Sequence, residues 1–386
     1  MKLVLVTHFF PSRGGGIEAV AEQLARHLLD ERPDLDIEWF ASKGERLPAP
    51  SARLRFVPVR AWHGIETKLG VPCPVWRARD LARLWRSIGR ADAVHLHDFS
   101  YHGNACAALF CVSRRKPFLV TQHIGPVPMK TRALEHALET LNSTLGVWIL
   151  NRAAARVFVS DVVRRYFQER GAKPGLVVPN GVDDAVFSPV APSERAQLRE
   201  RAGLAPDARV ALFAGRFVLK KGVSLVLELA RRTPEIEWIL AGRGPLDPGD
   251  APLPNVRVVR DRTAKGIADL FRVADILVLP SRGEGFPLVV QEALACGTPV
   301  LVESAIGEAA PDARQWMNFE TLDKTRDDIE RWSLKLRAIL DEMNASSNLP
   351  EQRAARAQWA RREWNWKTCA RSYLELLQAA LDKPAH

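Results

Sequence analysis

Short apolar runs alternate with amphipathic stretches along the first half of the chain. Residues 17–29 carry apolar side chains at positions 20, 21, 24, 25 and 28, the spacing of one face of a helix. Strands are predicted at 2–7, 37–41, 55–59, 93–96, 118–121 and 156–160. Strands that alternate with helices favour a parallel sheet with right-handed crossovers. Binding residues are then expected at the carboxyl ends of the strands.

The same alternation returns in the second half. Strands are predicted at 210–214, 237–241, 256–262 and 276–279, with helices at 264–273 and after Pro287. A proline suits the start of a helix, where its missing N–H costs nothing. A last helix near the C-terminus has an apolar stripe of Tyr373, Leu374, Leu377 and Leu381. The pattern predicts an α/β protein with a second sheet unit.

Length and charge refine this prediction. A chain of 386 residues is long enough for two domains of ordinary size. Residues 1–170 hold 25 Lys/Arg and 16 Asp/Glu, a net charge of +9, whereas 171–386 hold 30 and 29, a net charge of +1. A basic half beside a neutral half indicates that one domain alone meets an acidic surface.

Cysteine usage and hydropathy predict the compartment. The five cysteines are scattered without metal-type spacing, which favours a reducing cytosol. The apolar run at the N-terminus is too short for a signal peptide, and no run approaches 18 apolar residues. We therefore expect a cytoplasmic protein without a membrane span.

Polar groups follow several predicted strands of the first half. Gly14–Gly16 separates the first strand from its helix, which allows the backbone to approach a ligand closely. The loop is not G-x-G-x-x-G, so it does not predict a dinucleotide site. His8, His97-Asp98 and Gln122-His123 end three strands, and one of His95 and His97 is expected to point into the core.

The second half carries charges suited to a diphosphate. Gly215-Arg216 ends one predicted strand, and Lys220, Lys221 and Gly222 precede the next helix. Arg offers a planar fork and Lys a point charge, so the two can clamp a diphosphate. Further along, Glu284 lies in a glycine-containing loop and Glu292 on the helix that follows it. Two carboxylates beside the free N–H groups of a helix start suit a ligand with a central diphosphate and hydroxyls at both ends, which describes a nucleotide sugar.

The run EGFPLVVQEALACGTPV, at 284–300, resembles the Glu-x7-Glu motif of family 4 retaining glycosyltransferases. The resemblance covers most of the chain and is densest at 205–305. It implies the GT-B fold, with two Rossmann-like parallel-sheet domains facing a cleft and a C-terminal helix that crosses back to the N-terminal domain. The implied domains are 1–170 on the acceptor side, joined by 365–386, and 171–364 for the nucleotide sugar.

The resemblance also assigns residues to roles. It places Arg216 and Lys221 on the diphosphate, Glu284 on the donor sugar and Glu292 on the ribose hydroxyls. His123, in VTQHIGP, corresponds to a histidine near the sugar's C6 hydroxyl. The implied catalytic set is Glu284, Arg216, Lys221 and His123, and the implied donor-binding set is Glu292, Gly285, Phe286, Leu288, Gly15, Gly16, Gly244 and Arg262. Each assignment has a structural alternative. The glycines could form a tight turn only, His123 could be a structural histidine at a strand end, and Arg216 and Lys221 could be ordinary basic residues of the surface.

Two departures from the family pattern concern specificity. Residues 260–263 replace the usual glycine of a strand end, which leaves the base contacts open. After Gly307 the usual hairpin-like segment is missing. The donor is expected to be a UDP-sugar, with GDP-mannose as the alternative, and this preference rests on family frequency alone.

The expected reaction is transfer of a hexose-type sugar to a glycan or lipid-linked acceptor in bacterial-type surface polysaccharide assembly, with retention of configuration. The cationic groups around the diphosphate would substitute for a metal, so neither a cofactor nor a metal is expected. The alternatives are a GT-B epimerase or phosphorylase, and a non-catalytic nucleotide-sugar-binding protein associated with a membrane.

Residues 75–90 form a basic amphipathic segment with tryptophans. Leu81, Leu84, Trp85 and Ile88 share one face, and arginines occupy the other. This pattern is typical of an interfacial helix on anionic lipid, and equally of a domain helix with a solvated basic face. No helix-turn-helix, zinc or stacking motif supports nucleic acid as a partner. We expect the protein to be peripheral on the inner face of the cell membrane.

Overall fold

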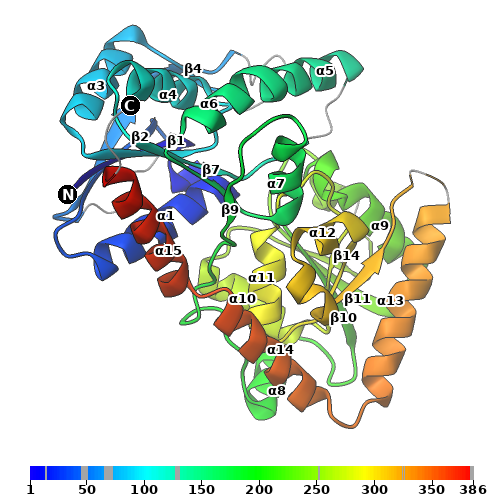
Figure 1. Cartoon of the computed structure of the whole chain (residues 1–386). Helices are drawn as coiled ribbons and strands as arrows, with labels where there is room; N and C mark the ends of the chain where they lie inside the picture. Colours follow the sequence, from blue (N-terminus) through cyan, green and yellow to red (C-terminus); the bar gives the residue numbers. More distant parts are fainter. Residues whose placement is uncertain are drawn as a thin grey trace. The chain divides into compact units, whose positions relative to one another are not determined.

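The computed structural model describes residues 1–13, 15–44, 51–64, 73–126, 131–250, 253–323, 325 and 327–382 (Figure 1). The chain forms two compact units. Unit 1 comprises Met1–Gly181 and Trp366–His386, and unit 2 comprises Val182–Asn365. The first domain predicted from the sequence ends at residue 170. The structure ends it at Gly181, because a further strand, Leu176–Val177, pairs with the sheet of unit 1.

Unit 1 is built on a parallel sheet of seven strands in the order β3-β2-β1-β6-β7-β8-β9. The strands are β1 (Lys2–Phe9), β2 (Asp36–Ser42), β3 (Leu54–Val59), β6 (Ala93–His97), β7 (Phe118–Gln122), β8 (Ala155–Phe158) and β9 (Leu176–Val177). Every residue of β6 and β7 is buried. Continuous burial is expected of strands with both faces covered, and it explains the apolar runs in the sequence. A separate antiparallel pair joins β4 (Ala61–Trp62) to β5 (Val75–Trp76).

Helices cover both faces of this sheet (Figure 1). They are α1 (Gly16–Glu31), α3 (Ala78–Arg90), α4 (His102–Ser113), α5 (Arg132–Leu141), a π-helical turn (Asn142–Gly146), α6 (Val147–Arg152), α7 (Asp161–Gln168) and α15 (Trp366–Leu381). The five apolar positions predicted for α1 are all buried. The C-terminal helix α15 belongs to unit 1 and packs beside α1, as the fold prediction required.

Unit 2 is built on a parallel sheet of six strands in the order β12-β11-β10-β13-β14-β15. The strands are β10 (Arg209–Ala214), β11 (Ile236–Ala241), β12 (Val256–Val259), β13 (Ile276–Leu279), β14 (Val300–Glu303) and β15 (Met317–Glu320). The helices are α8 (Pro192–Arg201), α9 (Val223–Arg232), α10 (Ala264–Val273), α11 (Leu288–Ala295), α12 (Ser304–Ala309), α13 (Asp327–Ala345) and α14 (Leu349–Glu363). Strand β12 ends three residues before the prediction, because Asp261 turns the chain with a φ of 60°.

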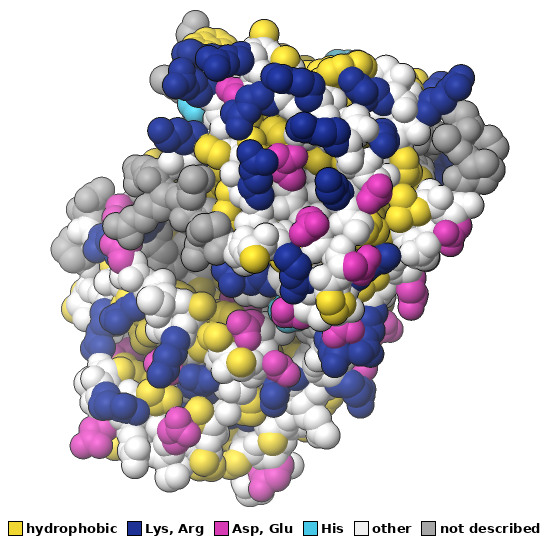
Figure 2. Space-filling model, turned by 90° about the vertical axis from the view of Figure 1, so that its left-hand side faces the viewer, with side chains coloured by type: hydrophobic (Ala, Val, Ile, Leu, Met, Phe, Trp, Pro, Cys, Tyr) yellow, Lys and Arg dark blue, Asp and Glu magenta, His cyan; other side chains and the backbone are white. Residues whose placement is uncertain are grey.

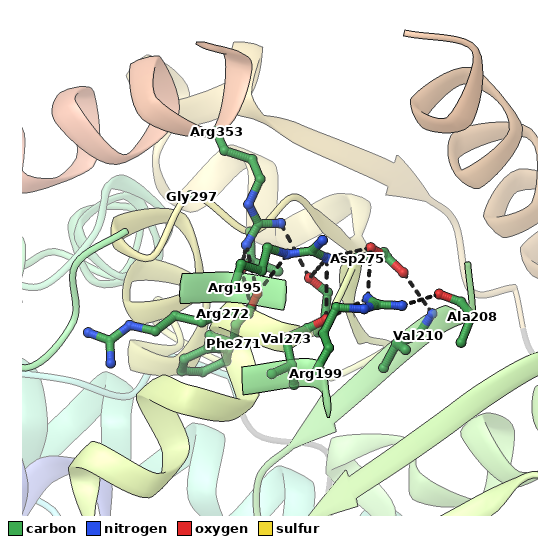
Figure 3. A network of polar contacts seen from close by, with 12 residues as sticks. Arg195, Arg199, Ala208, Val210, Phe271, Arg272, Val273, Asp275, Gly297 and Arg353 are labelled. Carbon is green, nitrogen blue, oxygen red and sulfur yellow. Dashed lines mark hydrogen bonds and ion pairs between the residues drawn. The ribbon is translucent and has the colours of Figure 1, made fainter. Parts of the chain in front are cut away.

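A polar network fastens helices α8 and α14 to the end of α10 (Figure 3). Arg195 Nη2 lies 2.6 Å from Asp275 Oδ1, and Arg199 Nη1 donates to the Val273 carbonyl at 2.9 Å. Arg353 on α14 donates to the Ala274 carbonyl at 3.3 Å. The last carbonyls of a helix lack intrahelical donors, so these arginines satisfy groups that burial would otherwise leave unpaired. Burial, followed by the nearby Arg195, lowers the pKa of Arg353 to about 9.

Helix α3 corrects one interpretation of the basic segment. Its apolar stripe does not face outward, because Leu84 and Ile88 are fully buried in the core of unit 1 and Leu81 packs against that core. Arg114 lies over the Trp85 ring at 3.9 Å, so this tryptophan is covered as well. α3 is therefore a domain helix with an exposed basic face. Within the described residues, no helix combines the length and the apolar composition needed to cross a bilayer.

A second correction concerns the two histidines of β6. Residues two apart on a strand face the same side, so His95 and His97 point together instead of apart. Their ring centroids lie 4.4 Å from each other, and both side chains are buried.

Candidate active site

Two loops at the carboxyl edge of the unit 2 sheet are packed backbone to backbone. Gly215 N–H donates to the Ala241 carbonyl at 2.9 Å, and Phe217 N–H to the Arg243 carbonyl at 2.8 Å. A Cβ at Gly242 would lie 1.9 Å from the Gly215 oxygen, and one at Gly244 would lie 2.3 Å from the Phe217 oxygen. Glycine is thus required at both positions by space alone. Gly244, a predicted donor-binding residue, lies on the strand end next to Arg216.

The loop after β10 is joined to the loop after β13. The chain makes a 3-10 turn at Leu219–Lys221 and leaves it through Gly222, whose φ of 75° favours glycine. A Cβ on Gly222 would lie 2.5 Å from the Pro280 oxygen. Arg282 N–H also donates to the Lys220 carbonyl at 2.8 Å. This close approach carries Lys221 to the loop that holds Glu284.

Lys221 and Glu284 form an ion pair. Lys221 Nζ lies 3.1 Å from Glu284 Oε1, Ser281 Oγ donates to the same oxygen at 3.0 Å, and Lys220 Nζ lies 3.7 Å away. Burial raises the pKa of Glu284, but attraction to Lys221 and Lys220 and the bonds from Lys221 and Ser281 outweigh it, so the net pKa is lowered. Glu284 is therefore held ionised. Lys220, expected to be solvated, is 40% exposed and lies within ion-pair range.

Arg216 differs from its neighbours because it has no partner. It directly follows Gly215, is exposed, and its guanidinium makes no hydrogen bond or ion pair with any described residue. An unpaired guanidinium on the strand end beside the Lys221–Glu284 pair is available to an anion.

Helix α11 supplies the second carboxylate. Pro287 caps it, with a φ of −68°, and Phe286 is buried against Trp364 at a centroid distance of 5.4 Å. The N–H groups of Leu288 and Val289 have no acceptor within the helix, whereas the Val290 N–H donates to the Pro287 carbonyl at 3.0 Å. Burial raises the pKa of Glu292 to about 7, and no described residue donates a hydrogen bond to its carboxylate. Glu292 is half-buried, so its carboxylate keeps some contact with water, and the hydroxyls of a ligand can replace that water as hydrogen-bond donors.

The loops after β11 and β12 are joined by ion pairs. Arg260 Nε donates to Asp247 Oδ2 at 3.0 Å, and Arg243 pairs with Asp261. Arg262, predicted to bind the donor, is exposed at the end of β12 without a partner among the described residues. β12 is the edge strand, two strands from β10, and no hydrogen bond or ion pair among the described residues joins Arg262 to the Lys221–Glu284 pair.

In unit 1, the glycine loop is packed on a carboxylate that the sequence analysis did not select. Gly14 lies outside the described residues. A Cβ on Gly15 would lie 2.0 Å from Glu18 Oε2, whereas a Cβ on Gly16 would meet nothing within 4 Å. Glu18 is buried and its Oε1 lies 3.1 Å from Nε2 of His8. Glu18 ends the run Gly15-Gly16-Ile17-Glu18, and a carboxylate so close after a glycine pair was the available signal.

His123 follows β7 within a buried polar cluster. Its Nε2 lies 2.9 Å from Nδ1 of His97, and its backbone N–H donates to Asp98 Oδ1 at 3.3 Å. Burial lowers the pKa of His123 to about 3, and burial raises the pKa of Asp98 to about 8. Asn104 Nδ2 donates to the carbonyls of His97 and Asp98 at 2.6 and 2.8 Å, which holds Asp98 at a φ of 63°. His97, Asp98 and His123 were expected at strand ends, whereas Asn104, on α4, was not singled out by the sequence.

The predicted residues therefore form two sets. In unit 2, Lys221 and Glu284 are in contact, Arg216 and Gly244 lie on adjoining strand ends, and Gly285, Phe286, Leu288 and Glu292 continue the loop of Glu284 into α11. In unit 1, Gly15, Gly16 and His123 follow β1 and β7, which are separated by β6 alone.

Acidic and histidine side chains do not gather into a metal site in the part of the chain that the structure describes. The sequence holds an Asp-x-Asp pair, Asp34 and Asp36, but Asp36 is the first residue of β2, so the pair lies at the amino end of that strand. Asp34 is bound by Arg32 at 3.1 Å.

Two parallel α/β sheet units and a C-terminal helix that returns to the first unit define the GT-B class of glycosyltransferases. The chain matches the family Glycosyltransferase Family 4 over residues 14–186 and Glycosyl transferases group 1 over residues 194–352. It belongs to this family 4 group of glycosyltransferases. The expected enzyme class and fold are thereby confirmed.

Relatives and solved structures agree with this assignment. The chain is 29% identical to a D-inositol 3-phosphate glycosyltransferase of Xylanimonas cellulosilytica, over 96% of this chain and 93% of the relative. It is 30% identical to D-inositol 3-phosphate glycosyltransferase 2 of Catenulispora acidiphila, over 76% and 75%. Sucrose-phosphate synthase from Thermosynechococcus elongatus has a TM-score of 0.75 at 19% identity, covering 98% of both chains. Anabaena Alr3699/HepE, in complex with UDP and glucose, has a TM-score of 0.74 at 19% identity, over 98% and 99%.

Proposed function

We propose that this glycosyltransferase transfers a hexose from a nucleotide diphosphate sugar, without a metal and with retention of configuration. A UDP-sugar is the favoured donor and GDP-mannose the alternative. The observation that carries the proposal is Glu292, a carboxylate with a pKa of about 7 and no hydrogen-bond donor among the described residues. Ribose hydroxyls are neutral donors that would satisfy it. The fold neighbour that holds UDP and glucose supports the preference for uridine.

The diphosphate is assigned to the cationic loops beside Glu292. Arg216 offers an unpaired guanidinium fork, and Lys221 offers the three N–H donors of an ammonium group, one of them directed at Glu284. The N–H groups of Leu288 and Val289 at the start of α11, with Gly285 and Phe286, are assigned as further donors. These groups stabilise the charge that grows on the diphosphate as it leaves, which is the task that a metal performs in other enzymes.

The reacting sugar is assigned to Glu284 and His123. Glu284 accepts hydrogen bonds from the sugar hydroxyls, because Lys221 keeps it ionised. The transition state carries oxocarbenium character, as in glycosyl transfer generally. No enzymatic nucleophile is assigned, and we propose attack on the same face with the leaving phosphate as base. Gly244 and Arg262 are assigned to the nucleotide end, and Gly15 and Gly16 to the donor's reacting end.

The acceptor is the least constrained partner. A glycan or lipid-linked acceptor in surface polysaccharide assembly fits the basic charge of unit 1. The names of the relatives favour a second candidate, a phosphorylated polyol such as D-inositol 3-phosphate. Both acceptor candidates are anionic or lie at an anionic surface, so the charge of unit 1 does not choose between them. Incubating one donor with each acceptor class, and measuring which one is glycosylated, separates them.

The exposed basic side chains of unit 1 are proposed to bind a membrane surface by electrostatic attraction alone. Exposed arginines on and beside α3 include Arg77, Arg79, Arg86 and Arg90, and Figure 2 shows Lys and Arg side chains gathered over unit 1. The apolar stripe of α3 is in the core, so we propose contact with anionic head groups without insertion. Peripheral association with the inner face of the cell membrane follows from this contact.

Lys221→Ala tests the donor site, with Lys220→Ala as the matched control on the same turn. We expect Lys221→Ala to lower kcat/KM by about 100-fold or more, since a charge-assisted contact to the leaving group is lost. Lys220→Ala should lower it less than tenfold. Equal activity of Lys221→Ala and the wild type would remove the clamp assignment.

Dependence on an acceptor separates the transferase from its alternatives. With a nucleotide sugar alone, a transferase releases little nucleoside diphosphate, and release rises when acceptor is added. An epimerase would interconvert the donor without acceptor, a phosphorylase would require phosphate, and a non-catalytic binding protein would release nothing under either condition.

A further inference from the structure

His97 and His123 are neighbours whose ring nitrogens face each other in the core of unit 1. His97 Nδ1 and His123 Nε2 are 2.9 Å apart, and the two rings lie nearly parallel, at 17°, with centroids 5.1 Å apart. Both imidazoles are neutral at pH 7, because burial lowers the pKa of each. One nitrogen of the pair must therefore carry the shared hydrogen and the other must accept it.

The remaining nitrogen of His97 decides between the two arrangements. His97 Nε2 is fully buried and has no partner among the described residues. If His123 donated to His97, this Nε2 would carry a hydrogen buried without an acceptor, and orphaned buried N–H groups are rare. If His97 donates from Nδ1, its Nε2 is instead a bare acceptor, which costs less. The geometry therefore favours a hydrogen on His97 Nδ1.

We propose that His97 is a positioning residue that fixes His123 as the Nδ1–H tautomer, so that His123 presents a neutral N–H donor to the substrate. His123 Nδ1 makes no hydrogen bond to a described residue, and it is not among the fully enclosed atoms that lack partners. It is the nitrogen of this pair that is left for a ligand. The inference rests on the proposed function, because that function supplies the oxygen to which His123 donates.

The surrounding groups hold the pair in place through hydrogen bonds. His95 Nε2 lies 2.8 Å from Thr121 Oγ1, and Thr121 Oγ1 lies 2.9 Å from the Tyr373 hydroxyl of α15. Burial lowers the pKa of His95 to about 3. Burial raises the pKa of Asp98 to about 8, and Asp98 accepts a hydrogen bond from the His123 backbone N–H. This bond fixes the position of the His123 backbone and therefore of the point from which its ring extends.

The tautomer has a chemical consequence. A neutral imidazole that donates from Nδ1 cannot take up a proton at that atom, so His123 acts as a hydrogen-bond donor and not as a general base. Its ligand must be an acceptor: a sugar hydroxyl oxygen or a phosphate oxygen. The residue that sets this role, His97, touches no ligand itself.

The direct test is imidazole NMR of the full chain labelled with 15N-histidine. Two-bond 1H–15N correlations distinguish the Nδ1–H tautomer, the Nε2–H tautomer and the charged ring, and His123→Asn serves only to assign the His123 signals. We expect Nδ1–H for both His97 and His123, unchanged between pH 6 and pH 8. An Nε2–H tautomer, an exchanging mixture or a charged ring at His123 overturns the proposal. This result does not depend on whether the donor is a nucleotide sugar.

A matched pair of variants tests the consequence for turnover. In His97→Asn the amide nitrogen takes the position of Nδ1 and can still donate to His123, whereas His97→Leu has similar volume and no donor. We expect His97→Asn to keep kcat within about threefold and His97→Leu to lose at least tenfold, with little change in the KM for the donor. The His123 signals should keep the Nδ1–H pattern in His97→Asn and lose it in His97→Leu. Equal kcat in the two folded variants contradicts the positioning role.

Discussion

Replacing Glu292 by glutamine should stabilise the protein at alkaline pH and at the same time weaken binding of the donor. Glutamine has nearly the same shape as glutamate and carries no charge. Glu292 has a folded-state pKa of about 7 against an ordinary value of 4.5, and burial is the cause. The substitution therefore removes a half-buried charge without opening a cavity.

The size and the sign of the change in the free energy of unfolding follow from proton linkage. The difference of about 2.5 pH units corresponds to about 3 kcal/mol at most, because one unit is worth about 1.36 kcal/mol. Partial access to solvent reduces this to about 1–2 kcal/mol. The folded state binds the proton more tightly than the unfolded chain. The penalty is therefore absent below pH 4.5, grows as the pH rises toward 7 and stays constant above that value.

Urea unfolding at pH 5 and pH 8 measures this effect. We expect Glu292→Gln and the wild type to differ little at pH 5, and the variant to be more stable by about 1–2 kcal/mol at pH 8. Glu200→Gln, on the exposed face of α8, is the control and should show no such difference. Parallel pH profiles for Glu292→Gln and the wild type would show that Glu292 is not desolvated.

Ligand binding supplies the second half of the test. If the ionised Glu292 accepts bonds from the ribose, wild-type affinity for a nucleotide sugar falls as the pH drops below 7, and the affinity of the variant is low and flat. An intact nucleotide sugar is used because a free terminal phosphate itself titrates near pH 6. A flat wild-type profile would refute the assignment of Glu292 to the ribose.

Three further predictions test other parts of the structure. Gly222→Ala should destabilise unit 2 by about 2 kcal/mol or more in urea unfolding, since its Cβ would meet the Pro280 oxygen at 2.5 Å. Gly203→Ala, with φ of 67° and open space, should cost only about 1 kcal/mol, and equal losses would contradict the clash. Arg353→Met should lower the free energy of unfolding by about 1–2 kcal/mol, because the Arg272 and Ala274 carbonyls keep Arg195 as a donor but lose Arg353. Arg362→Met, on the exposed side of α14, should cost less than about 1 kcal/mol. A triple replacement of Arg79, Arg86 and Arg90 by glutamine should weaken binding to anionic vesicles by about 100-fold at low salt, at about 1 kcal/mol per charge. The same number of arginines replaced in unit 2 (Arg201, Arg231, Arg232) should have little effect, and binding insensitive to salt would refute the electrostatic proposal.

Local patterns in the sequence were sufficient for most of the fold. Continuous apolar runs located the central strands, because parallel strands are buried on both faces and tolerate few polar residues. The spacing of the apolar positions fixed the face of α1, and Pro287 marked the start of α11. The boundary at Gly181 was missed because β9 has only two residues and is held by its pairing with β8.

Residue types and short spacings also carried part of the candidate site. The glycines after β10 and β11, the basic pair before α9 and the two glutamates around α11 are all local in sequence. What they could not show is which charges neutralise each other. Glu284 is paired with Lys221, Lys220 is close to the same oxygen, and Arg216 is left free of described partners.

Tertiary structure alone decided the electrostatic state of these groups. Burial raises the pKa of Glu292 to about 7. The packing of β6 beside β7 brings His97 against His123, and the packing of α3 puts its apolar stripe in the core. Each of these outcomes depends on how much water the neighbouring elements exclude and on which dipoles they bring close, and those neighbours come from distant parts of the chain. The sequence by itself determined where strands, helices and glycine turns form, because these depend on side chains a few residues apart.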